Sequence, residues 1–237
     1  SLTVFTSLKA RHIAGGEMSY QYIGPGSTSS TSTYQITLRL YRDCQSTGAQ
    51  LDPVAAITIY DNDDATKTIY KNLSVVLNNT QLVQLINPGP CIDNAPIVCY
   101  QIGSYFETVE LPVNRTGYTI SYQRCCRIDN IANIVNSTNA GATYTATIPG
   151  TSVLPKGYEN STPVFNTSDT VIICENNSFY YNFSAVDKEK DDLTYTFAPA
   201  YDGGTQNNPQ PTFATPPPYI NLGYSFGFSA LLPMGTG

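Results

Sequence analysis

Acidic residues alternate along one short polar stretch of the chain, and this spacing could bind a cation. Asp187, Glu189 and Asp191 are separated by single residues. Calcium prefers six to eight oxygen ligands at 2.3–2.6 Å, and three such carboxylates can curl around one ion while main-chain carbonyls complete its shell. The spacing therefore predicts calcium as a cofactor, with these three residues as ligands. Because Lys188 and Lys190 add positive charge, the alternative is a solvated hairpin turn without an ion.

Six cysteines indicate disulfide chemistry rather than metal binding. None belongs to a C-x-x-C pair, and the single histidine, His12, leaves a Cys/His metal cluster short of ligands. An even number of cysteines in a chain with few charges is typical of an oxidising compartment, so we predict three disulfides. Their pairing cannot be read from the sequence. The residues concerned are Cys44, Cys91, Cys99, Cys125, Cys126 and Cys174.

Cys125 and Cys126 carry a further constraint because they are adjacent in a predicted strand. Neighbouring side chains on a strand point to opposite faces. We therefore expect these two cysteines to bond different partners, one within the core and one at an edge.

The residues do not favour catalysis. His12 is the only histidine, the chain contains no G-x-S-x-G motif, and bonded cysteines leave no nucleophile with a base. Glu107 and Glu110 have an odd separation along a predicted strand, so they face opposite sides and cannot flank one glycosidic bond. We expect a protein that is not an enzyme. A glycan-active enzyme whose acidic pair forms only in the fold is the remote alternative.

The charge balance narrows the classes of partner. The chain has 12 Lys+Arg against 18 Asp+Glu, for a net charge of −6. This lacks the basic surface that nucleic acids or anionic lipids require. No apolar run approaches the length of a membrane span. We therefore expect neither nucleic-acid binding nor direct membrane insertion.

Apolar and polar residues alternate through most of the chain, which predicts an all-β fold. The clearest case is 34–41, where Tyr34, Ile36, Leu38 and Leu40 share one face. Short strands separated by Gly/Pro turns favour tandem antiparallel β-sandwich domains, Ig-like or cadherin-like, over parallel α/β units. The other predicted strands are 54–60, 69–77, 105–111, 118–123, 144–148, 171–174, 179–186 and 193–197.

A run of turn-forming residues near 154–163 predicts a domain boundary. It divides the chain into a disulfide-stapled β-sandwich domain at 1–158 and a second β domain at 159–237. The second domain is short, and we expect it to be incomplete at its C-terminus.

Several segments together resemble a known family. They are HIAGGE at 12–17, QRCCR at 123–127, STPVFN at 161–166 and VIICENN at 171–177. The chain resembles the N-terminal region of very large Bacteroidota cell-surface proteins exported by the type IX secretion system, many of them associated with gliding motility. The resemblance implies a modular β-rich adhesin or appendage subunit at the extracellular bacterial cell surface.

The same resemblance bears on individual sites. The acidic stretch is similar to the D-x-D-G-D-x-L-x-Y calcium turn of cadherin-like adhesin modules, although Lys190 stands where glycine is expected. Asp169-Thr170-Val171 is similar to the O-glycosylation motif of this bacterial group, which implies Thr170 as an acceptor. Relatives tend to carry a cysteine after the 193–197 strand, where this chain has Ala198, so the partner of Cys174 is left open.

Two functional hypotheses follow. In the first, the chain is a non-catalytic adhesive module that mediates attachment to a surface or cell, with a cell-surface or glycan target. In the second, it is a self-assembling subunit of an extracellular filament or appendage. The expected partners are other copies of the chain or further domains of the same long polypeptide.

Overall fold

The computed structural model describes residues 12–84, 97–153, 156–166 and 177–235. Among these residues the regular structure is almost entirely β. Two short 3-10 helices, η1 (Ser137–Asn139) and η2 (Gly157–Glu159), interrupt it. No helix in the described ranges is long and apolar enough to cross a membrane. The strands are β1 (Ile13–Pro25), β2 (Thr31–Asp43), β3 (Val54–Asp61), β4 (Ile69–Gln84), β5 (Cys99–Pro112), β6 (Tyr118–Cys125), β7 (Gly141–Ile148), β8 (Val164–Phe165) and β9 (Ala185–Val186).

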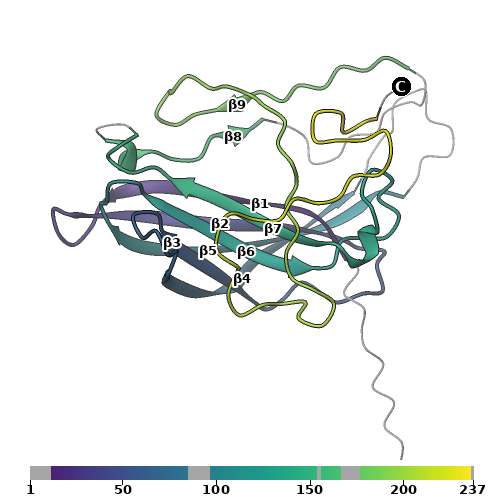
Figure 1. Cartoon of the computed structure of the whole chain (residues 1–237), viewed down its shortest axis with the longest axis horizontal. Coiled ribbons are helices and arrows are strands. Elements are labelled where there is room, and N and C mark those ends of the chain that lie inside the picture. The colour runs from purple at the N-terminus through teal and green to yellow at the C-terminus, as the bar shows by residue number, and fades with distance from the viewer. Residues whose placement is uncertain (1–11, 85–96, 154–155, 167–176, 236–237) are drawn as a thin grey trace, which may run out of the picture.

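Seven of these strands form one antiparallel sheet, in the order β1-β2-β5-β4-β3-β6-β7 (Figure 1). The long strand β4 connects its two halves. Its first part pairs with β3 up to Val76, and from Leu77 onward it pairs with β5. The register shifts between Leu77 and Asn79, and a bulge of this kind bends a strand and increases its twist. The sheet therefore curls so that its two halves face each other across a shared core.

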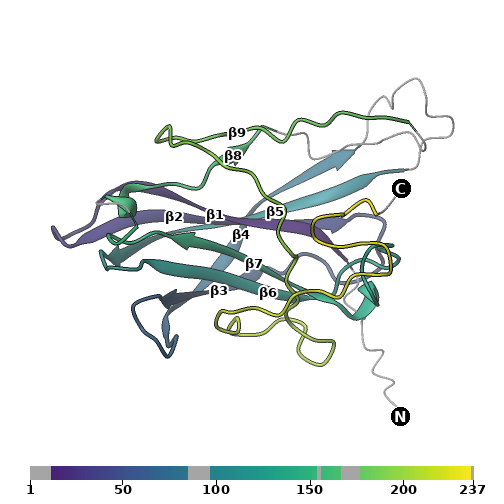
Figure 2. The same cartoon turned by 45° about the horizontal axis from the view of Figure 1, so that its top comes forward.

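The two ends of the sheet approach each other, so the sheet is nearly closed into a barrel (Figure 2). The main-chain N–H groups of His12 and Ile13 donate to the Cys126 carbonyl oxygen at 3.3 Å, which ties the start of β1 to the chain just after β6. A Cβ atom on Gly16 would lie 2.7 Å from the Arg39 carbonyl oxygen on β2 and 2.8 Å from Tyr144 Cζ on β7, so glycine lets β1 pass close to both strands. The all-β antiparallel prediction is confirmed, but the strands form one curled sheet rather than clear tandem sandwiches.

The core lies inside the curl and follows the predicted alternation. Along β2, inward residues are buried at every second position. The fully buried members include Ile36, Leu38, Ile57, Tyr105 and Ile120. The predicted strands at 34–41, 54–60, 69–77, 105–111, 118–123 and 144–148 all lie within strands of this sheet.

The later strand predictions hold less well. The predicted strand at 193–197 is wrong, because these residues form no regular structure. Of the segment 179–186, only Ala185–Val186 is a strand, and it pairs with Val164–Phe165 in a separate two-stranded ribbon. The predicted strand at 171–174 lies outside the described residues.

Residues 200–224, which we call the cover segment, lie across the outer face of β3, β6 and β7 (Figure 1). Ala214 N donates to Thr58 Oγ1 at 3.0 Å, and Thr215 N donates to Gln123 Oε1 at 3.1 Å. A Cβ atom on Gly141 would lie 1.7 Å from the Gly203 carbonyl oxygen, so the segment fits here only against glycine. As a result, every residue of β6 is buried. The domain boundary at residue 158 remains a prediction. Residues 200–224, which follow it in the chain, pack on the outer face of the seven-stranded sheet.

Candidate functional site

The edge of β1 is extended by the chain that follows η2. Tyr20 N donates to Thr162 Oγ1 at 3.0 Å, and Thr162 N donates back to the Tyr20 carbonyl oxygen at 2.9 Å. Tyr22 N donates to Ser161 Oγ at 3.1 Å. An edge strand exposes unpaired main-chain groups, and these contacts satisfy several of them. The start of the predicted second domain is therefore fixed to the sheet.

The acidic stretch docks onto this junction through its carboxylates. Glu189 accepts hydrogen bonds from Ser161 N at 3.2 Å and from Ser161 Oγ at 2.8 Å. Asn160 Nδ2 donates to Asp191 Oδ2 at 3.3 Å, and Asp191 N donates to Asp187 Oδ1 at 3.0 Å. This acidic stretch, residues 187–192, which we call the acidic turn, thus connects the two predicted domains by hydrogen bonds and also carries negative charge.

The three predicted calcium ligands are not brought together around one point. Within the described residues, no group of three or more His, Cys, Asp or Glu side chains lies close enough to hold a metal ion. Glu189 is engaged with Ser161, while Asp187 and Asp191 line a neighbouring cavity together with Asp192. Calcium binding by Asp187, Glu189 and Asp191 stays a prediction, and it requires the turn to rearrange.

The cavity at this junction, which we call the junction cavity, has a volume of about 480 Å³. That volume lies in the range of sites for small ligands or single side chains. Its walls come from β1, the end of β7, the chain after η2 and the acidic turn. The lining residues are Tyr20, Thr147, Pro149, Asn160, Ser161, Pro163, Asp187, Asp191, Asp192 and Leu193.

The described cysteines form disulfides as predicted, but two of them do not have the predicted partners. Cys44 and Cys99 form a disulfide with Cα atoms 5.6 Å apart, which joins the end of β2 to the start of β5. Cys125 and Cys126 are bonded to each other, so the expectation of separate partners is wrong. The strand β6 ends at Cys125, and strand alternation therefore does not apply to Cys126. Cys91, Cys174 and the proposed acceptor Thr170 lie outside the described residues.

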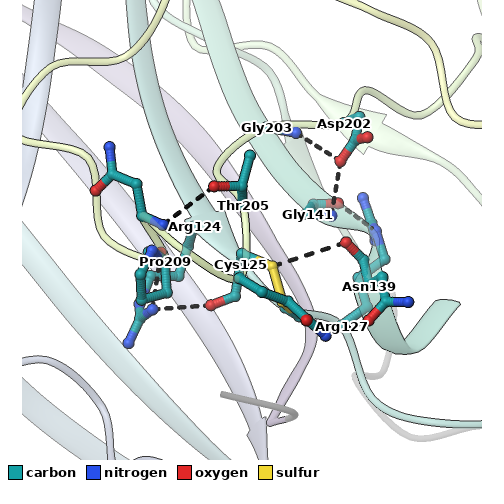
Figure 3. The surroundings of a disulfide bond; sticks show 12 residues. Arg124, Cys125, Arg127, Asn139, Gly141, Asp202, Gly203, Thr205 and Pro209 are labelled. Carbon is teal, nitrogen blue, oxygen red and sulfur yellow. Dashed lines mark hydrogen bonds between the residues drawn. A yellow bond between two sulfur atoms is a disulfide. The ribbon is translucent and has the colours of Figure 1, made fainter. Parts of the chain in front are cut away.

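The Cys125–Cys126 disulfide is enclosed by the cover segment (Figure 3). Cys125 N donates to the Pro209 carbonyl oxygen at 2.9 Å. Beside it, Asp202 Oδ1 accepts hydrogen bonds from Gly141 N at 2.6 Å and from Gly203 N at 2.8 Å (Figure 3). Both cysteines are almost completely buried, so the disulfide at this end of β6 has a structural role.

A buried ion pair lies next to the disulfide. Arg124 Nε is 2.7 Å from Asp52 Oδ2, and Arg124 Nη2 is 3.0 Å from Asp52 Oδ1. Arg124 Nη1 also donates to the carbonyl oxygens of Cys125 and Pro209, each at 2.8 Å. Tyr122 OH donates to Asp52 Oδ2 at 3.3 Å. The first arginine of the QRCCR block therefore joins the sheet, the cover segment and the loop before β3.

The buried side chain of His12, near Arg124, makes no hydrogen bonds with the described residues. It is 1% exposed, and neither ring nitrogen has a hydrogen-bond partner among the described residues. Burial, followed by the charges of Arg124 and Arg42, lowers the pKa of His12 from 6.5 to about 4. The imidazole is therefore neutral at pH 7. No hydroxyl or thiol of the described residues lies within hydrogen-bond distance of either ring nitrogen.

We expect His12 to make the fold less stable in acid. The unfolded chain takes up a proton near pH 6.5 and the folded chain only near pH 4, so stability falls as the pH is lowered between these values. The loss from this residue is about 3 kcal/mol, from 1.36 kcal/mol per pKa unit. Urea unfolding of wild type and His12→Leu at several pH values measures it, since carboxylate titrations common to both proteins cancel. An unchanged difference from pH 7 to pH 4 would contradict the prediction.

Sequence reasoning missed several residues that the fold brings to these sites. Tyr20 and Asn160 line the junction cavity, yet neither belongs to the acidic pattern. Asp52 stands alone in a loop, and nothing in its neighbours marks it as the partner of Arg124. Gly141 lies three residues before the predicted strand at 144–148, and a glycine at such a place can indicate the close approach of another chain segment.

Comparison with known proteins adds no relative, since no family model, curated protein or solved structure matches the chain.

Proposed function

We propose that the chain is a non-catalytic structural and adhesive module of a large secreted bacterial surface protein, and that it binds other copies of itself. The observation that carries this proposal is a set of exposed aromatic side chains. They lie in the described residues 164–166 and 177–199, which we call the arm. Phe165, Tyr180, Phe183 and Phe197 are 54%, 92%, 58% and 61% exposed.

The arm has few contacts of its own to cover these side chains. Its two strands pair only over Val164↔Val186 and Phe165↔Ala185, and they lie outside the seven-stranded sheet (Figures 1 and 2). Phe165 and Tyr195 approach each other with ring centroids 6.5 Å apart, yet both remain half exposed. A lone two-stranded ribbon is marginally stable in water, and large exposed apolar patches are typical of interaction sites. Pairing with the arm of another copy adds strands and buries the rings.

Two further features support the surface-protein assignment. The Cys44–Cys99 disulfide is typical of an oxidising, extracellular environment. The low charge content, with 13% charged residues, leaves little like-charge repulsion to oppose packing of copies.

Light scattering coupled to size-exclusion chromatography tests the proposal. We expect wild type to form a defined oligomer and Phe165→Ser/Phe197→Ser to be monomeric, because the variant removes two exposed rings from the arm. Phe106→Ser is the matched control, since Phe106 is 42% exposed on β5 and lies outside the arm. A monomeric wild type would contradict contact between copies and favour display of the module towards a surface or glycan.

The same experiment tests the calcium prediction. If calcium organises the acidic turn, the oligomer of wild type should be weakened in EDTA and restored by excess calcium. An oligomer that is identical in calcium and EDTA would remove the cofactor from the proposal and leave the arm contact in place.

A further inference from the structure

The junction cavity has the charge of a site for a cation. Asp187, Asp191 and Asp192 line it, and none of the described lining residues is basic. Asp192 accepts no hydrogen bond from the described residues. Carboxylates that line one cleft make its electrostatic potential negative and attract positive groups. The cavity therefore has at least one carboxylate available to a ligand.

The arrangement suits an organic cation better than an inorganic ion. A calcium ion needs six to eight oxygens at 2.3–2.6 Å. The part of the chain that the structure describes gathers no group of three acidic, histidine or cysteine side chains at such a spacing. A guanidinium or ammonium group is larger and can reach carboxylates that stand apart, because each N–H donates to a separate acceptor.

A second observation independent of the acidic residues points to a ligand. Tyr20 is 7% exposed and lines the cavity, but its hydroxyl makes no hydrogen bond with the described residues. Burial, with the charges of Tyr34, Glu189 and Asp187, raises the pKa of Tyr20, so the hydroxyl keeps its proton. The hydroxyl oxygen is not among the fully enclosed side-chain atoms without a partner in the described residues, so it stays accessible to a group that enters the cavity. Its oxygen can accept a hydrogen bond from an N–H group held at the carboxylates.

The remaining walls are apolar. Pro149, Pro163 and Leu193 line the same cavity. Long basic side chains pack their methylene stems against such surfaces while the charged end reaches polar groups. We propose that the junction cavity binds a basic side chain, arginine or lysine, presented by a polypeptide partner, with Asp187, Asp191 and Asp192 holding the charge and Tyr20 accepting a hydrogen bond.

Short peptides provide the test, with isothermal titration calorimetry of the whole chain. The probes are acetyl-Gly-Arg-Gly-amide, its lysine counterpart and its citrulline counterpart, which keeps the shape of arginine without the charge. We expect the two basic peptides to bind, more weakly at high salt, and the citrulline peptide not to bind. Arginine should bind more tightly than lysine because its planar fork can engage two carboxylates.

Two variants assign the site. We expect Asp192→Asn to weaken binding of the arginine peptide about fivefold, as for loss of one partly exposed charge pair. Tyr20→Phe removes only the hydroxyl and should weaken binding about fivefold by loss of one hydrogen bond. Glu107→Gln, the same loss of one negative charge at an exposed position on β5, should bind the peptide as wild type does.

Several outcomes would overturn the proposal. One is equal binding of the arginine and citrulline peptides, and another is no binding of either basic peptide. A third is that the chain binds calcium chloride or a neutral oligosaccharide but neither basic peptide, and that Asp192→Asn abolishes this binding. The proposal does not depend on contact between arms, because Phe165→Ser/Phe197→Ser should still bind the arginine peptide. If the Asp192→Asn variant is monomeric where wild type is oligomeric, the basic side chain comes from another copy of the chain. An unchanged oligomer places it on a different polypeptide.

Discussion

Replacement of Asp52 by alanine is expected to lower the free energy of unfolding by about 3–5 kcal/mol, as for loss of one partner from a buried ion pair. The Arg124 guanidinium would keep two main-chain acceptors but lose both carboxylate contacts. Its side chain is only 5% exposed, so water cannot replace them. Urea denaturation followed by tyrosine fluorescence measures the loss.

An exposed ion pair of the same chemistry supplies the control. Arg39 Nη1 lies 2.6 Å from Glu17 Oε1, but the two side chains are 31% and 44% exposed. Water screens this pair, so Glu17→Ala should cost about 1 kcal/mol or less. The double variant Asp52→Leu/Arg124→Met should recover much of the lost stability, because apolar side chains can replace a buried pair. Equal losses for Asp52→Ala and Glu17→Ala would show that burial does not set the strength of the Arg124 contact.

Removal of the Cys44–Cys99 disulfide is expected to cost about 4 kcal/mol, from the loop-closure entropy of a long loop. The bond closes a loop with a sequence separation of 55 residues. Without it, the unfolded chain gains conformations that the folded chain does not. Cys44→Ala/Cys99→Ala compared with wild type in urea, without reductant, measures the effect.

The two single variants provide a check, because loss of either sulfur removes the same bond. Cys44→Ala and Cys99→Ala should each be about as unstable as the double variant. A double variant within about 1 kcal/mol of wild type would mean that the disulfide adds little to the fold, against the expectation from its loop length.

The sequence predicted the sheet well where one face of a strand meets the core and the other meets water. Strand β2 is the example, with Ile36 and Leu38 buried and their neighbours half exposed. On β6 the same alternation predicts the strand correctly, but the polar face is buried too, because the cover segment lies over Ser121 and Gln123. Alternation reports a difference in polarity between two faces, and it cannot tell water from a polar segment of the same chain.

The site was predictable only in part for a similar reason. The acidic turn was recognisable because its members are neighbours in the chain, and the structure places Asp187 and Asp191 at one cavity. Tyr20 reaches that cavity from more than 160 residues away in the chain, and Asp52 meets Arg124 across 72 residues. Contacts at such separations depend on how the sheet curls, which local patterns do not specify.

The polar face beneath the cover segment also affects the order in which the fold can be completed. All seven strands of the sheet precede residue 149, whereas the residues that cover β6 come from 200–224. A chain that is synthesised from its N-terminus can therefore form the sheet before the cover segment has been made. This outer face carries Thr58, Ser121 and Gln123 beside the hydroxyl-bearing Tyr60, so water can solvate its polar groups until the cover segment replaces that water.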